Sequence, residues 1–527
     1  MSASIISALP LQHDVYARAL DARDPRFDGV FFVGIITTRI YCRPVCPARI
    51  SYRDHRRFFP SAAAAEVAGF RPCMRCRPEL APGLAHIDAV PRLAREAANR
   101  IAAGALNGRT VAQLANDLGV SERHLRRALE RETGASPLEL AQTHRLLLAK
   151  RLLSDTELSI IRIAFASGFQ SLRRFNAAFR TQYRMTPRDL RVSRPKGAGR
   201  PTRSSEAAPV RLSLSYRAPI AWEALLTFLR RDAVAGIDFV DGARYGRTVQ
   251  LGGETGFVLV ESTPAPARRG TSAIKAATIR SRARRNAVEA SRVNHVSVSI
   301  SESLVPVLMP LLARLRQLFD LDAQPTLIDA HLARGPLRAL VAQRPGIRIP
   351  GALDGFDMAL RAILRGSTLG AGVDNESNTL PARVAEALGE EIETGIPSLT
   401  RLAPSPDAVA DAGVERLEGC GVPRHRANAA VAVARLVTDR RLHLAPGGDP
   451  IGAHQLLTGV GVDDQLARLI VMRALSWPDT LPVSDRTLQR AAGVHSTGEL
   501  EMRSEEWSPW RTYAALQLWL EGPGHRV

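Results

Sequence analysis

The stretch Cys42-Arg-Pro-Val-Cys46, together with Cys73-Met-Arg-Cys76, decides the fold of the amino-terminal segment. The C-x3-C pair and the C-x2-C pair supply four thiols at the spacings that close a tetrahedral zinc site. Paired cysteines in a chain without an export signal favour a metal over disulfides, which are the alternative in a secreted protein. The fifth cysteine, Cys420, lies far downstream and is expected to be a buried hydrophobic residue.

Arginine is frequent around these thiols. A purely structural zinc site does not need this positive charge, so the surrounding arginines indicate contact with phosphate. We expect Arg43, Arg49 and Arg71 to contact the phosphates of DNA. The full set is Arg39, Arg43, Arg49, Arg53, Arg71, Arg75 and Arg77.

Length and charge indicate a multidomain protein with a polyanionic partner. The 527 residues suffice for three or four domains. The formal net charge of +19 and the pI near 10.8 favour nucleic acid, and an acidic membrane surface is the alternative. No apolar run reaches the roughly 20 residues that span a bilayer, and the first residues lack the pattern of a signal peptide. We therefore expect a cytoplasmic protein that does not enter membranes.

Changes in residue pattern predict a multidomain α+β protein. Helical periods dominate the second and the last segments, whereas alternating apolar residues predict strands between them. An alanine-rich helix is predicted from Ser61 to Ala68, and the basic stretch from Arg268 to Arg285 is either a solvated loop or a DNA contact. The predicted segments are a cysteine domain at 1–85, a helical domain at 88–192, a basic linker at 193–209, an α+β subdomain at 210–302 and a helical domain at 303–527.

Two helix-turn-helix units are predicted in the first helical domain. In one unit an apolar helix ends at Gly119, and Ser121 caps the next helix. In the other unit Gly168 makes the turn, and Ser171 starts the second helix. We expect the outward polar residues of the two second helices to bind DNA, namely Arg123, His124, Arg126 and Arg127, and Ser171, Arg173, Arg174 and Asn176.

The two units are joined by one long helix and end in Met185-Thr-Pro187-Arg-Asp-Leu-Arg191. Over about 100 to 191 this arrangement resembles the AraC family of DNA-binding domains. The resemblance implies that each second helix enters a major groove. It also implies RNA polymerase as a partner of the bound protein. A plain helical bundle is the alternative, because any tight helical pair imitates a single unit.

One family is matched by three stretches of the cysteine segment, which are Thr37-Thr-Arg-Ile-Tyr-Cys42-Arg-Pro-Val-Cys46-Pro-Ala-Arg49, Phe58-Phe59 and Ala68-Gly-Phe-Arg-Pro-Cys73-Met-Arg-Cys76-Arg-Pro-Glu79. They resemble the N-terminal domain of the Ada adaptive-response family, in which an AraC-type domain also follows. The resemblance implies that Cys42 irreversibly accepts a methyl group from a DNA methylphosphotriester, and that Cys46, Cys73 and Cys76 complete the zinc shell. An inert structural zinc site is the alternative.

Methylation at such a site predicts a switch. Four thiolates on one Zn²⁺ carry a formal charge of about −2, and methylation of one sulfur removes one negative charge beside the DNA backbone. Repulsion then falls, and the affinity for DNA rises. The adjoining helix-turn-helix units can convert this gain into promoter binding and transcription activation.

The carboxyl-terminal part carries five stretches that match a second family, which are Arg344–Gly351, Phe356–Leu364, Met472–Leu475, Leu481–Asp485 and Trp507–Trp519. Residues 210 to 527 resemble AlkA-type 3-methyladenine DNA glycosylases, which have a small sheet domain before a helix-hairpin-helix body. The resemblance implies that the damaged nucleotide is flipped out of the duplex, and that Asp485 is the catalytic carboxylate. No lysine follows Lys275, so simple hydrolysis is expected and a Schiff-base step is not.

Individual residues of this part also have structural interpretations. Asp485 could cap a helix that starts near Arg486, and capping can coexist with catalysis. Trp507 and Trp510 are expected to line the base pocket, with core packing as the alternative. Gly459 and Gly461 are expected to contact DNA phosphates as the glycines of the hairpin.

Several residues depart from the glycosylase pattern. Counting back from Arg473 places Asp463 at the second hairpin glycine, and negative side chains oppose phosphate binding. Gln465 and Leu469 stand where the family has aromatic residues, and the wedge segment reads Arg365-Gly-Ser-Thr-Leu369. Two functions therefore remain open: a repair enzyme and regulator, or a regulator whose glycosylase part is only a DNA-binding body. A third alternative is a plain AraC-type regulator that senses a small effector. We expect a monomer.

Overall fold

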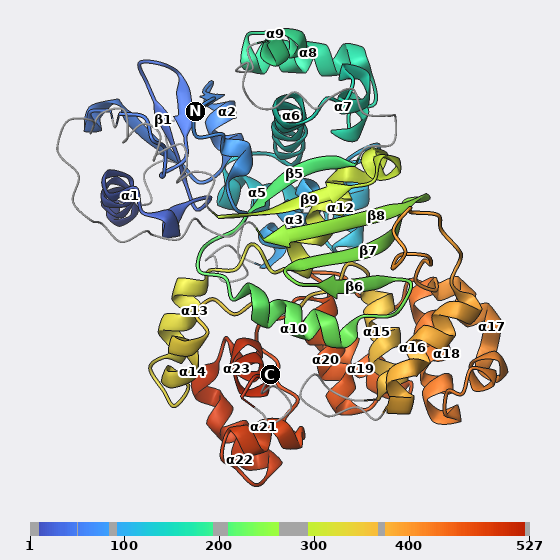
Figure 1. Cartoon of the computed structure of the whole chain (residues 1–527). Helices are drawn as coiled ribbons and strands as arrows, with labels where there is room; N and C mark the ends of the chain where they lie inside the picture. The colour runs from blue at the N-terminus through green and yellow to red at the C-terminus, as the bar shows by residue number, and fades with distance from the viewer. Residues whose placement is uncertain are drawn as a thin grey trace, which may run out of the picture. The chain divides into compact units, whose positions relative to one another are not determined.

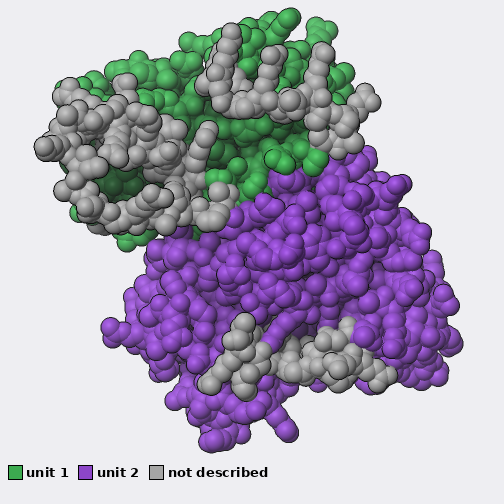
Figure 2. Space-filling model, in the orientation of Figure 1, with its two compact units in different colours: residues 1–217, 263–297, 305–313 green, residues 218–262, 298–304, 314–527 purple. Residues whose placement is uncertain are grey.

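The computed structural model describes residues 10–49, 51–83, 92–192, 209–262, 294–366 and 375–521. The chain divides into two compact units, which Figure 2 shows in different colours. The first unit comprises 1–217, 263–297 and 305–313, and the second comprises 218–262, 298–304 and 314–527. The predicted linker up to residue 208 and the basic stretch from Arg268 to Arg285 lie outside the described residues.

The first unit contains a small sheet that carries the cysteines. Its strand order is β3-β1-β2-β4, with β1 antiparallel to β2 and β3, and β2 parallel to β4. Val33 lies opposite Cys42 in the register of β1 and β2. The elements of this segment, coloured blue in Figure 1, are α1 (Pro10–Ala22), β1 (Phe32–Ile35), β2 (Ile40–Cys42), β3 (Arg56–Phe59), α2 (Ala62–Val67), β4 (Arg71–Pro72) and the short helix η3 (Pro78–Leu80).

Alternating side chains along β1 give this sheet two apolar faces. Val33 packs with the four cysteines, whereas Phe32 packs on the other face with Tyr41 and Phe70. Gly34 lacks a side chain for a steric reason, because a Cβ there would lie 2.7 Å from the ring of Phe70. Apolar packing on both faces of the sheet therefore holds β1 and its neighbour β2, the strand that ends in Cys42.

The predicted alanine-rich helix is α2. Ser61 caps it by accepting a hydrogen bond from the backbone N–H of Ala64, over 3.0 Å. Gly69 follows it with a φ of +83°, a conformation that glycine adopts without a steric cost.

The helical part of the first unit contains both predicted helix-turn-helix units. Gly119 and Gly168 make the two turns with φ values of +67° and +86°. Ser121 and Ser171 each cap the second helix of their unit, as predicted. The elements are α3 (Arg92–Ala102), α4 (Val111–Asp117), α5 (Glu122–Thr133), α6 (Pro137–Asp155), α7 (Ile160–Ala166), α8 (Leu172–Tyr183), α9 (Pro187–Val192) and the strand β5 (Val210–Ser215).

The second unit combines strands with many helices. Within it the strands run in the order β9-β8-β7-β6, and β7 pairs with β8 over its whole length. Its strands and first helices are α10 (Trp222–Asp232), β6 (Asp238–Asp241), β7 (Arg244–Leu251), β8 (Glu254–Ser262), β9 (His295–Ile300), α12 (Leu308–Leu318), α13 (Pro325–Leu332), α14 (Arg338–Gln343) and α15 (Gly355–Arg365), of which β9 and α12 begin in the first unit. The remaining helices are α16 (Asn375–Leu388), α17 (Pro406–Gly419), α18 (Arg424–Thr438), α19 (Pro450–Gly459), α20 (Asp464–Ala474), α21 (Arg486–Ala491), α22 (Thr497–Ser504) and α23 (Arg511–Trp519).

These elements confirm the predicted fold class: a small cysteine domain, a helical domain with tandem helix-turn-helix units, a sheet and a helical body. Among the described residues, none of the helices has both the length and the apolar character that a bilayer crossing requires.

Candidate functional sites

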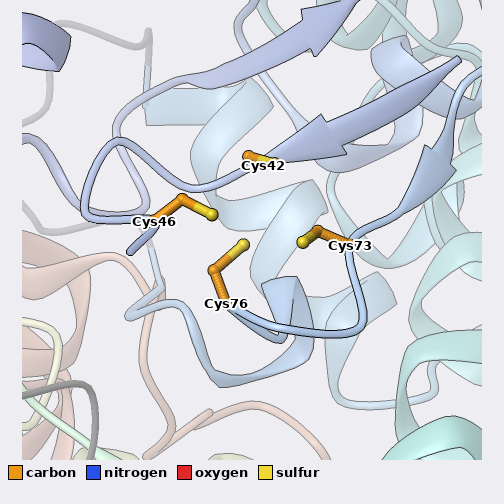
Figure 3. A group of neighbouring side chains, drawn as sticks. All are labelled: Cys42, Cys46, Cys73 and Cys76. Atoms are coloured by element: carbon orange, nitrogen blue, oxygen red, sulfur yellow. The ribbon is translucent and has the colours of Figure 1, made fainter. Parts of the chain in front are cut away.

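Four cysteine side chains converge at one end of the amino-terminal sheet (Figure 3). Their sulfur atoms all lie within 4.8 Å of one another. Zinc with Zn–S bonds of about 2.3 Å needs sulfur separations of about 3.8 Å, so a small closure of this cluster completes a tetrahedral site. Burial raises the pKa of the Cys76 thiol, which opposes four thiolates without a cation. Cys42, Cys46, Cys73 and Cys76 therefore suit a zinc ion.

The four thiols are not equivalent. The backbone N–H of Arg75 donates to Cys73 Sγ, and that of Arg43 donates to Cys76 Sγ, both over 3.4 Å. In the described part of the chain no backbone N–H donates to Cys42 or Cys46. Cys42 is also the most exposed of the four, at 9% against 1% for Cys76. Since hydrogen bonds withdraw electron density from a thiolate, Cys42 and Cys46 keep more nucleophilic sulfurs than Cys73 and Cys76.

Arg43 corrects one prediction. Its side chain is 5% exposed and forms an ion pair with Asp28, with Nε donating to Oδ1 over 2.8 Å. It also donates to the carbonyl oxygen of Cys76 over 3.1 Å. Arg43 therefore holds the loop between the first two cysteines, and its guanidinium is buried against Asp28 instead of facing outward as predicted. Charge count alone could not separate it from its neighbours, because its partner lies 15 residues away in the sequence.

The other two arginines of the cysteine segment keep access to solvent. Arg49 is exposed, and Arg71 is partly exposed in β4. Both can reach an external phosphate, so their assignment as DNA contacts stays a prediction.

The second helices of both helix-turn-helix units present basic faces. Arg123, His124 and Arg127 are exposed on α5, and Arg173 and Arg174 are exposed on α8. The other predicted contact residues are only partly exposed; they are Arg126, which donates to Glu122 over 2.9 Å, Ser171, whose hydroxyl accepts from the backbone N–H of Arg174, and Asn176.

Asp485 is buried in the second unit, at 3% exposure. One carboxylate oxygen accepts the backbone N–H groups of Thr487 and Leu488, over 2.7 and 3.0 Å, and so caps α21 as the alternative interpretation predicted. The other oxygen accepts the indole N–H of Trp519 over 3.2 Å. The carboxylate is therefore held in place by three hydrogen-bond donors.

The two tryptophans predicted for the base pocket lie in the core. Trp507 is 2% exposed and Trp510 is 3% exposed, and Trp510 packs edge-on against Tyr513. The aromatic residue that contacts Asp485 is Trp519, which sequence reasoning did not single out. Its position in the last helix, within a stretch already matched to the glycosylase family, was the available signal.

The predicted hairpin consists of α19, a turn and α20. Gly461 lies in the turn with a φ of +90°, whereas Gly459 is the last residue of α19. Asp463 caps α20 by accepting the backbone N–H of Gln465 over 2.9 Å. A phosphate at this helix start would have to displace an anionic side chain, as the sequence predicted.

Glu66 connects the cysteine sheet to α6. Its carboxylate accepts the hydroxyl groups of Tyr41, over 3.0 Å, and of Thr143, over 2.7 Å. Burial raises the pKa of Glu66 to about 7, although these two hydrogen bonds and the nearby charge of Lys150 act in the opposite direction.

This pKa predicts how stability depends on pH. A raised carboxyl pKa stabilises the folded state below about pH 4.5, and this contribution is lost as the pH rises through about 7. Between pH 4.5 and 8, the free energy of unfolding of the first unit is therefore expected to rise in Glu66→Gln by up to about 3 kcal/mol relative to wild type. All five tryptophans lie in the second unit, so hydrogen exchange of α6 peptides is the suitable measurement. Glu130→Gln, at an exposed carboxylate, is the control; equal pH profiles for both variants would contradict the prediction.

These features define a multidomain DNA-binding protein with a metal–thiolate site. They are a cluster of four thiols suited to a metal, two basic helix-turn-helix units, and a sheet-plus-helix body with a buried carboxylate. The sequence family described as "Metal binding domain of Ada" matches residues 16–79, "Helix-turn-helix domain" matches 114–193, and "AlkA N-terminal domain" matches 211–354.

One relative matches this chain over almost its whole length. The chain is 36% identical over 515 residues to "Probable bifunctional transcriptional activator/DNA repair enzyme AlkA" of Mycobacterium tuberculosis (strain H37Rv), covering 96% of each chain. It belongs to this family of bifunctional transcriptional activators and DNA repair enzymes. It is also 27% identical to Escherichia coli "DNA-3-methyladenine glycosylase 2", over 58% of this chain and 96% of the relative. With the E. coli "Bifunctional transcriptional activator/DNA repair enzyme Ada" it shares 37% identity, over 25% of this chain and 35% of the relative.

Proposed function

We propose that Cys42 takes a methyl group from DNA methylphosphotriesters. The cluster of four thiols, in which Cys42 is the most exposed, carries this proposal. A zinc ion bound by the four cysteines keeps their sulfurs deprotonated at neutral pH. The Cys42 sulfur attacks the methyl carbon, and an S–C bond forms as the C–O bond breaks. The electron pair remains on the phosphate oxygen, so a phosphodiester anion leaves and Cys42 becomes an uncharged thioether. The reaction consumes the protein, because a thioether is stable.

Methylation then switches the chain to promoter binding. The cysteine cluster loses one negative charge, while the exposed arginines of α5 and α8 keep their positive charges. Less repulsion from the DNA backbone favours the bound state, in which the helix-turn-helix units occupy the major groove. RNA polymerase is the partner that such a bound activator would recruit. The proposal includes a monomer that acts in the cytoplasm, where its partner is double-stranded DNA.

The switch predicts a measurable change in affinity. The methylated chain is expected to bind duplex DNA on the order of tenfold more tightly than the unmethylated chain near 0.1 M salt. Added salt should reduce the gain, because the charges are then screened. Fluorescence anisotropy with labelled duplex measures both quantities, and protein treated with unmodified oligonucleotide is the control. Equal affinity of the two forms at low salt would contradict the switch.

For the second unit we propose a monofunctional DNA glycosylase that removes alkylated bases such as 3-methyladenine. The buried carboxylate of Asp485 stabilises the positive charge that develops on the sugar as the cationic base departs, and water then adds to the sugar. Trp519 holds this carboxylate in place. The competing proposal is a DNA-binding body that does not excise bases. Asp463 at the start of α20 favours it, because its carboxylate already accepts the backbone N–H of Gln465 that a phosphate would need.

A further inference from the structure

Buried polar contacts join the cysteine segment to α6, the helix between the two helix-turn-helix units. Glu79 and Lys150 form an ion pair in which both side chains are 1% exposed. Next to it, the Arg77 guanidinium makes two hydrogen bonds to the Asp155 carboxylate, over 2.8 and 2.9 Å. We call these four residues the clamp.

The clamp begins next to the thiol cluster. Arg77 directly follows Cys76 and has a φ of +52°, and it also donates to Glu79 over 2.9 Å. The surrounding structure must hold this unfavourable backbone conformation in place. The buried Glu79–Lys150 pair fixes the geometry, because either partner alone would be an uncompensated charge in the protein interior.

A second connection starts from Cys42. Tyr41, the preceding residue in β2, donates to Glu66, and Glu66 accepts a hydrogen bond from Thr143 of α6. Thr143 is 4% exposed, so this contact is also shielded from water. Both the strand of Cys42 and the turn after Cys76 are thereby tied to the same helix.

Further contacts reach both helix-turn-helix units. The Ser61 hydroxyl donates to the carbonyl oxygen of Thr133, at the end of α5, over 2.6 Å. The side chain of Gln182 on α8 donates to the carbonyl oxygen of Phe70 over 3.1 Å. Ala63 of α2 packs in the same apolar cluster as residues of α3, α5 and α6. The cysteine segment therefore contacts α6 and the second helix of each helix-turn-helix unit.

We infer that the clamp and the Tyr41–Glu66–Thr143 connection make the thiol centre and both helix-turn-helix units a single rigid DNA-binding body. When α5 and α8 bind DNA, the thiol centre is then already positioned beside it, and no conformational entropy is lost in placing it there. The gain in DNA affinity on methylation of Cys42 therefore adds fully to the operator affinity. A loosely tethered thiol centre would engage DNA only part of the time, because its effective concentration would be lower. Arg77, Glu79, Lys150 and Asp155 act as positioning residues, and the inference rests on the proposed methyl acceptor.

The test loosens the clamp without leaving the fully buried Glu79 or Lys150 as an unpaired charge, while the partly exposed Arg77 keeps side-chain amide oxygens as hydrogen-bond acceptors. In the full chain, Glu79→Gln, Lys150→Met and Asp155→Asn are combined. Asp117→Asn is the matched control, because it removes one negative charge from an exposed ion pair with Arg109 in the same domain. Each protein is methylated with a random-sequence oligonucleotide that carries a methylphosphotriester. Affinity is then measured, before and after methylation, for a duplex selected by the methylated wild-type chain.

The expected result separates uptake from coupling. The triple variant should take up the methyl group at close to the wild-type rate, whereas its affinity gain on methylation should fall from about tenfold to below about threefold. Asp117→Asn should keep the full gain. A full gain in the triple variant would overturn the inference, and so would a zinc-loaded triple variant that takes up no methyl. No uptake or no gain in wild type would instead refute the proposed function.

A milder pair of variants covers the case in which the triple variant does not bind zinc. Thr143→Val removes the hydrogen bond to Glu66 with little change in shape, and Thr143→Ser restores it. A reduced gain in Thr143→Val, restored in Thr143→Ser, supports the inference. Equal gains in the two variants overturn it.

Discussion

Cys42→Ser is expected to abolish methyl uptake from methylphosphotriester DNA, by a factor of more than about a thousand. A serine hydroxyl stays protonated at neutral pH and is a far weaker nucleophile than a thiolate. Cys46, Cys73 and Cys76 remain in the variant, but two of them accept backbone N–H bonds and all are less exposed than Cys42. Transfer of radiolabelled methyl from DNA to protein measures the effect directly.

Two controls make the Cys42→Ser result specific. Cys420, which is only partly buried and not fully buried as predicted, lies outside the cluster, so Cys420→Ser should leave uptake at the wild-type rate. Zinc content, measured by metal analysis of each variant, shows whether the remaining three sulfurs still hold the ion. Undiminished uptake by zinc-loaded Cys42→Ser would remove Cys42 from the acceptor role.

Asp485→Asn is expected to reduce release of 3-methyladenine from methylated DNA by at least about a hundredfold. The amide removes the negative charge that stabilises the sugar cation. Its carbonyl oxygen can still accept the backbone N–H groups of Thr487 and Leu488, so the cap of α21 should persist, whereas the amide nitrogen cannot accept the Trp519 indole N–H. Chromatography of the released bases, at an enzyme concentration well above that of the substrate, gives the rate.

Asp449→Asn is the matched control for this variant. Asp449 caps α19 through the backbone N–H groups of Ile451 and Gly452, so the same substitution tests capping without the catalytic role. It should retain the wild-type rate of base release. If wild type releases no base under these conditions, the second unit is a DNA-binding body, which agrees with Asp463 at the hairpin.

The features that sequence predicted correctly depend on local chemistry. Ser121 and Ser171 cap the helices that they were predicted to start, because an N-cap needs only its own side chain and a backbone N–H three residues on. The turns at Gly119 and Gly168 follow from the left-handed conformation that glycine tolerates. The cysteine spacing likewise predicted which four side chains would meet.

The features that sequence missed depend on distant partners. Arg43 was predicted to face DNA, but its side chain is neutralised by Asp28, a residue that no local pattern links to it. Trp519 reaches Asp485 across 34 residues, and Lys150 reaches Glu79 across 71 residues. Such contacts depend on how separate elements pack, and residue types alone do not determine this.

Mass spectrometry of the cysteine peptide tests the central claim most directly. After exposure to an oligonucleotide with one methylphosphotriester, the protein is digested and the peptide with Cys42 is fragmented. Pro44 follows Arg43, so trypsin leaves Cys42 and Cys46 in one peptide, and fragment ions must locate the added group. We predict a gain of one CH2 group on Cys42 in every protein molecule that has reacted. A methyl group on Cys46, Cys73 or Cys76, or none on any of the four, would contradict the account.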